Sequence, residues 1–170
     1  YDSPVSIQAP YSGLNPPHSE DMQIKVTDYY TEARLAMERM AELYGHLFGV
    51  RSVGMRFFSV YGPKEESKKQ YANMVSQFLW DLQARRTPVV YGDGLQTRDF
   101  VFVKDVVRAL KMAMETDYHG ILNVGTGKAH SFNDVVAVLN KMLDLSIEPQ
   151  HIENPIKNYV MHTLADTAKA

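Results

Sequence analysis

The chain contains 170 residues, of which 45% are hydrophobic and 22% charged, so it can bury the core of one domain or of a large part of a bigger one. A formal net charge of −2 provides no field for a polyanion, which argues against nucleic acid as a partner. The absence of cysteine excludes disulfides and thiolate metal sites, and no apolar run is long enough to span a membrane.

Helices and short strands alternate along the chain. Residues 1–27 are rich in Pro, Ser and Gly and predict a loop, as do residues 59–70. Apolar residues at helical spacing predict helices over residues 28–48, 71–85, 104–115 and 131–143. Short apolar segments predict strands over residues 51–58, 88–91, 100–103 and 121–124, with extended pieces near 149–152 and 160–164. This alternation predicts an α/β fold.

The first predicted helix carries a tyrosine and an arginine at helical spacing. Tyr30 and Arg34 stand four residues apart, so their side chains share one face. A cation in that position would stabilise a tyrosinate and make Tyr30 a usable base. The same spacing also fits a purely structural pair.

The stretch Tyr91–Asp105 reads YGDGLQTRDFVFVKD. Gly92 and Gly94 predict a tight turn, and Arg98 follows at the start of an alternating strand. The planar fork of a guanidinium offers paired donors to a phosphate and keeps its charge at physiological pH. Taken alone, the stretch also fits a turn followed by a surface Arg98–Asp99 pair.

The order of these segments resembles the C-terminal half of the extended short-chain dehydrogenase/reductase family, specifically its NAD-dependent nucleotide-sugar epimerases and dehydratases of the UDP-glucose 4-epimerase type. The resemblance covers nearly the whole chain. It rests on five collinear segments, which are DYYTEARLAMERMAELYGHLFGV, SVGMRFFSVYGP, VVYGDGLQTRDFVFVKDVVRAL, ILNVGTGKAHSFNDVV and LADTAKA.

The resemblance implies catalytic and cofactor-binding residues. Tyr30 falls at the catalytic tyrosine, and Arg34 falls where the family usually has a lysine that binds the nicotinamide ribose. Arginine can supply the charge but has a bulkier fork. Ser6 lies near the position of the upstream serine that contacts the reacting hydroxyl. Phe57 and Phe58 fall at the strand end beside the nicotinamide, although either also fits a core position.

The resemblance also implies a substrate site. Arg98 matches the arginine that clamps the nucleotide diphosphate. Ser59 replaces an asparagine that contacts the sugar or the diphosphate, and Asn73 lies in the region that closes over the nucleotide. Lys157 stands near the place of a second family arginine that holds the diphosphate.

The implied fold is the C-terminal part of a Rossmann-type, doubly wound parallel sheet plus a smaller mixed α/β lobe that binds the nucleotide-sugar. Residues 1–62 would belong to the NAD-binding domain and residues 63–170 mainly to the substrate lobe, with 104–125 returning to the Rossmann sheet. The glycine-rich NAD fingerprint is absent from these residues. The chain therefore resembles a fragment that would pair with an N-terminal half or form a homodimer.

The resemblance implies an NAD-dependent nucleotide-sugar 4-epimerase that acts on a UDP- or dTDP-hexose through a transient 4-keto sugar. The alternatives are a 4,6-dehydratase of the same family and a binding or interaction module without catalysis. No carboxylate lies in Val5–Ala9, where dehydratases carry an Asp-Glu pair, which favours the epimerase. The six histidines lack metal-ligand spacing, and no secretory leader is visible, so we expect a cytoplasmic protein without a metal.

Overall fold

The computed structural model describes residues 14–24, 26, 29–156 and 159–170. Its helices are α1 (Tyr29–Phe48), α2 (Met74–Gln83), α3 (Val103–Met114) and α4 (Phe132–Leu143), with a 3₁₀ helix η1 (Glu66–Tyr71). Its strands are β1 (Val53–Phe57), β2 (Ser59–Tyr61), β3 (Val89–Tyr91), β4 (Thr97–Phe102), β5 (Gly120–Val124), β6 (Ala129–Ser131) and β7 (Gln150–Ile152). The predicted α/β class is confirmed.

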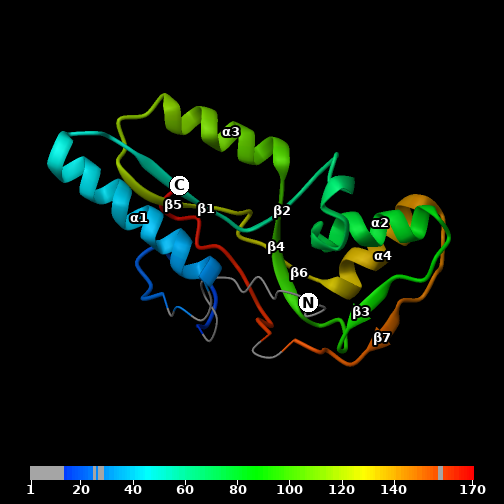
Figure 1. The fold of residues 1–170 in the computed structure, drawn as a ribbon. Coiled ribbons are helices and arrows are strands. Elements are labelled where there is room, and N and C mark those ends of the chain that lie inside the picture. The colour runs from blue at the N-terminus through cyan, green and yellow to red at the C-terminus, as the bar shows by residue number, and fades with distance from the viewer. Residues whose placement is uncertain (1–13, 25, 27–28, 157–158) are drawn as a thin grey trace.

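The parallel strands β1 and β5 lie between two helices. Their register pairs Val53 with Gly120 and Phe57 with Val124. Figure 1 shows α1 on one side of this strand pair and α3 on the other, so this part of the molecule is layered as helix, sheet and helix. α1 leaves Leu47 and Phe48 63% and 67% exposed. None of the helices in the described ranges combines the length and the apolar composition that crossing a membrane requires.

The rest of the chain forms a second cluster of elements. β4 lies between a parallel partner, β2, and an antiparallel partner, β6, while β3 and β7 pair in parallel. α2 and α4 pack together beside these strands (Figure 1). The apolar core between them consists of Phe78, Leu82, Val90, Phe132, Val136 and Leu139. Burying each such side chain stabilises the fold by about 1.5–3 kcal/mol.

Two predicted boundaries are wrong. The segment 59–70, predicted as loop, contains β2 and most of η1, because β2 pairs with β4 across about forty residues of sequence. α2 begins at Met74 rather than at residue 71, because the Asn73 side chain caps the helix by accepting a hydrogen bond from Val75 N at 3.0 Å. α4 begins with a capping box that Ser131 and Asp134 form.

His18 joins the N-terminal loop to the C-terminal tail. Its backbone N donates to Leu164 O at 2.8 Å, and Asp166 N donates to His18 O at 3.0 Å. The ring is fully buried, with Nε2 3.3 Å from Leu14 O and Nδ1 3.2 Å from Leu164 O. Burial lowers the pKa of His18 below its ordinary value, although these two carbonyls oppose the shift. The ring is therefore neutral near pH 7.

This burial predicts a pH-dependent stability. Because the folded state binds the His18 proton less readily than the unfolded chain does, the free energy of unfolding should fall as the pH drops below the ordinary histidine pKa of 6.5. Urea unfolding at about pH 7.5 and about pH 5.5 measures this loss. The loss should be smaller in His18→Gln and unchanged in the control His46→Gln, whose side chain is 75% exposed. An equal loss in His18→Gln and the wild type would contradict this assignment.

Candidate functional site

The N-terminal end of α1 brings Tyr30 and Arg34 together. The Arg34 guanidinium carbon lies 4.9 Å from the centre of the Tyr30 ring, so the predicted shared face is confirmed. Tyr30 is 45% exposed, whereas the neighbouring Tyr29 is 96% exposed and faces solvent. In Figure 1 this end of α1 points toward the middle of the molecule.

A partly buried ion pair attaches α1 to β1. Arg56 Nε and Nη2 each donate to the Glu38 carboxylate at 2.8 Å, and Arg56 Nη1 donates to Glu20 O at 3.0 Å. Glu38 continues the row of Tyr30 and Arg34 along the helix, since each follows the last by four residues. Eight residues of helix span about 12 Å, so Tyr30 lies two turns from this anchor. The helix runs opposite to β1, which places Tyr30 toward the carboxyl ends of the strands (Figure 1).

The chain crosses from one strand pair to the next at Phe57, Phe58 and Ser59. Phe57 ends β1 and is 46% exposed, so it is not a core residue. Phe58 N donates to Val124 O at 3.1 Å at the end of β5. Ser59 begins β2 opposite Phe100 of β4, so it is a strand residue rather than the predicted loop residue.

Arg98 lies two residues before Phe100, on the same face of the sheet as Ser59. Its Nη1 donates to Thr97 O at 2.7 Å and to Met161 O at 3.1 Å. The guanidinium stacks between two rings, with 5.6 Å to the centre of Phe132 and 5.2 Å to that of Tyr159.

The Arg98 guanidinium is not neutralised by a carboxylate of the described ranges. Among the described residues, no carboxylate lies within ion-pair distance of this guanidinium. Burial lowers the pKa of Arg98, and the Tyr159 hydroxyl offsets part of the effect. Arginine nevertheless stays protonated in proteins. A partly buried cation without a carboxylate is the electrostatic arrangement that an anionic ligand completes.

Asp99 does not pair with Arg98, and the surface-pair interpretation is wrong. Successive side chains of a strand point to opposite faces, so Asp99 turns inward and is completely buried. Its Oδ1 accepts from Thr126 N and Thr126 Oγ1, both at 2.7 Å. Its Oδ2 accepts from Gly127 N at 2.9 Å and from Ala165 N at 3.1 Å. The carboxylate therefore holds the turn after β5 against the C-terminal tail.

Gly125 and Asn123 complete this junction. A Cβ on Gly125 would lie 2.6 Å from Ala165 Cβ and 2.7 Å from Asp99 Oδ2, so only glycine fits there. Asn123 is fully buried, and its Nδ2 donates to His18 O at 2.8 Å and to Asp166 O at 3.1 Å. The role of this side chain is structural, because it joins the segment at His18 to the segment at Asp166.

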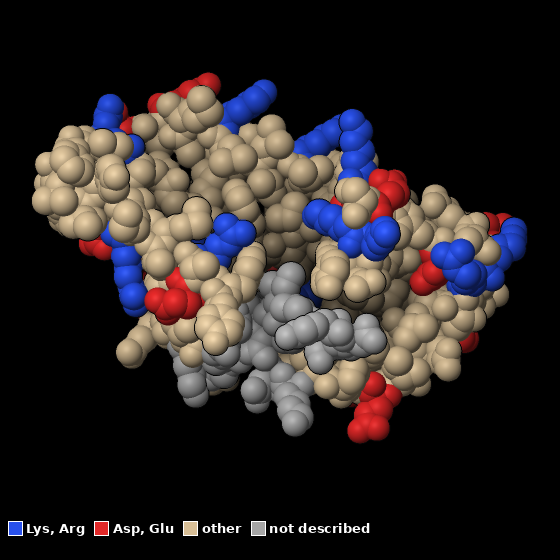
Figure 2. Space-filling model, viewed as in Figure 1, with Lys and Arg blue, Asp and Glu red and all other residues tan. Residues whose placement is uncertain are grey.

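These elements surround a depression. Figure 2 shows the molecular surface hollowed between the part that carries α1 and α3 and the part that carries α2, with lysines and arginines on both rims. A sequence model described as the NAD dependent epimerase/dehydratase family matches residues 5–125.

The chain belongs to the NAD-dependent epimerase/dehydratase family.

Relatives in this family have several substrates. The chain is 27% identical to a UDP-glucuronate 4-epimerase of Thermodesulfobacterium geofontis, covering 98% of this chain and 50% of that protein. It is 31% identical to an ADP-L-glycero-D-manno-heptose-6-epimerase of Alkalilimnicola ehrlichii, covering 92% and 51%. The solved UDP-N-acetylglucosamine 4-epimerase of Methanobrevibacter ruminantium superposes with a TM-score of 0.89 at 29% identity, covering 94% and 52%. The chain thus spans about half the length of these relatives.

The superposition confirms the predicted Rossmann-type fold class. The cofactor of the epimerase/dehydratase family is NAD, as the resemblance implied. Neither finding tests the division at residue 62 or the roles of individual side chains, which stay predictions. Ser6 and Lys157 lie outside the described residues.

In this epimerase-family chain the Asn73 side chain has partners within the protein. Besides capping α2, its Nδ2 donates to Val60 O at 3.0 Å. Asn73 N lies 3.4 Å from a carboxylate oxygen of Glu65, a residue that is only 6% exposed. Asn73 therefore ties α2 to β2, and its contact with a substrate stays a prediction.

Glu65 organises the segment before α2. It accepts hydrogen bonds from Ser76 Oγ and from Lys68 Nζ, the latter at 2.9 Å. Burial would raise the pKa of Glu65, but the hydrogen bonds from Ser76 and Lys68 outweigh it and hold the pKa below its ordinary value. The carboxylate thus keeps η1 and α2 together as one unit.

Tyr159 is a site residue that the sequence analysis missed. It stacks on Arg98 from the C-terminal tail, sixty-one residues away in sequence. In the sequence, Tyr159 is recognisable only as an aromatic residue close to Lys157, which the resemblance placed near the diphosphate. Its contact with Arg98 depends on the fold.

The junction at Asp99 leads to a stability prediction. In Asp99→Asn the amide NH₂ would face backbone N–H donors, so two or more hydrogen bonds are lost in a buried place. We expect the free energy of unfolding to fall by about 2–4 kcal/mol. Urea unfolding measures the change. The control Asp105→Asn, at an exposed position of α3, should change it by no more than about 0.5 kcal/mol, and similar losses in the two variants would contradict the assignment.

Proposed function

We propose that this chain provides the active-site helix and the diphosphate-binding part of an NAD-dependent nucleotide-sugar 4-epimerase. The observation that carries the proposal is the Arg98 guanidinium, which is partly buried, stacked between two rings and without a carboxylate partner in the described part of the chain. Its charge and geometry suit the diphosphate of a UDP- or dTDP-hexose. The 4-epimerases among its relatives support the choice of reaction.

Arg34 and Tyr30 would hold the nicotinamide ribose of NAD. Within the described ranges, Arg34 makes no ion pair. Its side chain contacts one hydrogen-bond acceptor there, the Met37 sulfur, at a weak 4.0 Å. Its donors are therefore available to ribose hydroxyls, which fits this cofactor. NAD, when bound, supplies an acceptor for the hydride and returns it.

In the proposed reaction Tyr30 removes the proton from the C4 hydroxyl, so the phenolate oxygen gains the proton as the 4-keto sugar forms. Arg34 stabilises that phenolate from the next turn of the helix, where it already stacks on the ring. Arg98 holds the diphosphate while the sugar turns its other face. Tyr30 then returns the proton to the oxygen at C4.

Relatives also include 6-epimerases of an ADP-heptose, at 31% identity over most of this chain. This observation makes epimerisation at C6 the second candidate, in which the same tyrosine and arginine would serve a different carbon. A 4,6-dehydratase and a binding module without catalysis stay alternatives from the sequence.

The catalytic proposal predicts activity that depends on Tyr30. Combined with an N-terminal NAD-binding half of the epimerase type and incubated with NAD and UDP-glucose, the chain should form UDP-galactose, detected by chromatography. Tyr30→Phe should lower the rate by about 10³-fold, because the base is removed. Tyr29→Phe, which alters the exposed neighbour, should retain the wild-type rate. UDP binding without product would refute catalysis by this chain and support the module, whereas turnover of ADP-heptose alone would support the 6-epimerase.

The diphosphate site predicts a binding defect. Arg98→Ala should weaken the binding of UDP by about 10- to 100-fold in titration calorimetry, because a bidentate charge-assisted contact is lost. Arg98→Lys should recover only part of the affinity, since an ammonium lacks the planar fork. The control Arg108→Ala, on the exposed side of α3, should bind as the wild type does. Equal affinity in Arg98→Ala would exclude Arg98 as the anion-binding residue.

A further inference from the structure

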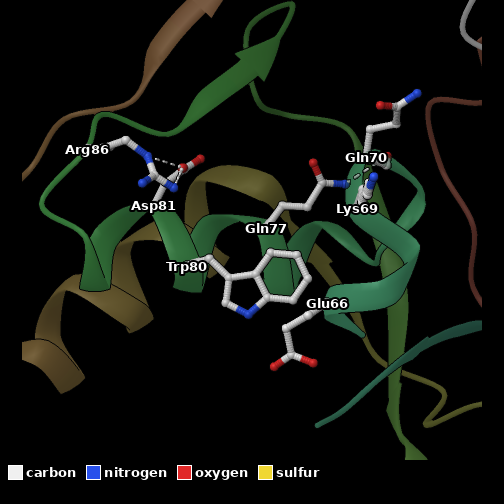
Figure 3. A pocket seen from close by; sticks show the side chains of 7 residues that line it. All are labelled: Glu66, Lys69, Gln70, Gln77, Trp80, Asp81 and Arg86. Carbon is white, nitrogen blue, oxygen red and sulfur yellow. Dashed lines mark hydrogen bonds and ion pairs between the residues drawn. The ribbon is translucent and has the colours of Figure 1, made fainter. Parts of the chain in front are cut away.

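An open surface cavity lies apart from the candidate site. It is formed between η1 and α2 and has a volume of about 300 Å³ (Figure 3). This volume is at the lower end of the range for small-molecule sites. None of the residues assigned above to the cofactor or the substrate lines it.

The floor of this cavity is Trp80, the one tryptophan of the chain. Figure 3 shows its indole ring with Gln77 above it and Glu66 on the opposite side. An indole presents a flat apolar face, against which C–H groups of a ligand can pack.

Polar groups of both signs surround the indole. Asp81 and Arg86 form an ion pair of 2.9 Å at one end. Gln77 Nε2 is bound to Ala72 O at 2.7 Å, which fixes the orientation of its amide. Glu66 and Lys69 stand at the other end and form no ion pair among the described residues. A carboxylate and an ammonium are thus both available to a ligand.

The backbone at Lys69 is strained. Its φ of 50° and ψ of −123° interrupt η1 and fall in a region that glycine adopts readily and other residues rarely do. Such strain persists only where the surroundings enforce it, and it clusters at ligand-binding segments. Lys69 itself lines the cavity.

The mixture of charges decides the class of ligand. The carboxylates of Glu66 and Asp81 oppose a phosphate, and the cations of Lys69 and Arg86 oppose a simple amine. A hydroxyl both donates and accepts, so it can satisfy a carboxylate, an ammonium and an amide alike. A sugar ring also offers a C–H face for the indole. We propose that this cavity binds an uncharged saccharide, at a site separate from the reaction and independent of the proposed function.

The single tryptophan makes the test specific, because emission excited in the indole band comes from Trp80 alone. The purified chain is titrated with glucose, with N-acetylglucosamine and, as an anion probe, with sodium phosphate. We expect a saturable change in emission with at least one sugar at millimolar concentration, and none with phosphate. Saturation-transfer NMR on the sugar protons provides a second readout.

Variants locate the binding. Glu66→Ala and Lys69→Gly, both at exposed positions, should raise the half-saturating sugar concentration at least about fivefold, since each removes a charged partner of the hydroxyls. Glu148→Ala, an exposed carboxylate elsewhere, and Arg98→Ala should leave it unchanged. Circular dichroism verifies the fold of each variant.

Any of the following results would overturn the proposal: the absence of saturable sugar binding, equal sugar binding in Glu66→Ala, Lys69→Gly and the wild type, or a saturable change in Trp80 emission with phosphate that persists in Arg98→Ala. Loss of the signal in Arg98→Ala would also overturn it, because the sugar would then occupy the other site. Failure of the epimerase assay would leave these results unaffected, so the two proposals are tested separately.

Discussion

The Asp99 carboxylate is the interaction on which the arrangement of this protein depends. Four hydrogen bonds, from the turn after β5 and from the C-terminal tail, converge on one fully buried side chain in β4. A buried carboxylate is tolerated only when its oxygens are satisfied in this way. The three segments meet at close range, since Gly125 has no room for a Cβ beside Ala165. The turn, the tail and the central strand are therefore held as one unit.

The position of the Arg98 side chain follows from the burial of Asp99. Because neighbouring side chains of a strand alternate, directing Asp99 inward directs Arg98 to the other face. There it has carbonyl oxygens and two aromatic rings as neighbours, and no carboxylate within the described residues. Arg98 and Asp99 are adjacent in sequence but have different roles: Asp99 is a structural anion, whereas Arg98 is a cation available to a ligand. This division is the physical basis of the proposed diphosphate site.

Helix α1 is attached to the sheet independently of Asp99. The bidentate pair between Arg56 and Glu38 fixes α1 to β1, and the row of side chains on that face carries Tyr30 and Arg34 toward the carboxyl ends of the strands. In parallel α/β folds, ligands bind at this edge. Arginine in place of the family lysine keeps the charge beside the tyrosine ring but brings a wider, planar donor group. The ion pair thus positions the helix, and the two residues to which we assign a catalytic role lie further along the same face.

The sequence by itself determined what depends on local spacing. The helices, the glycine turn before β4, the capping of α4 by Ser131 and the shared face of Tyr30 and Arg34 all follow from contacts within a few residues. Only the tertiary structure decided the inward turn of Asp99, the stacking of Tyr159 on Arg98 and the strand at Ser59. Asp99 and Ala165 are 66 residues apart, and no local pattern encodes which distant backbone groups a carboxylate will meet. Such pairings are selected by the packing of the whole chain, because buried polar groups take whichever partners the fold brings to them.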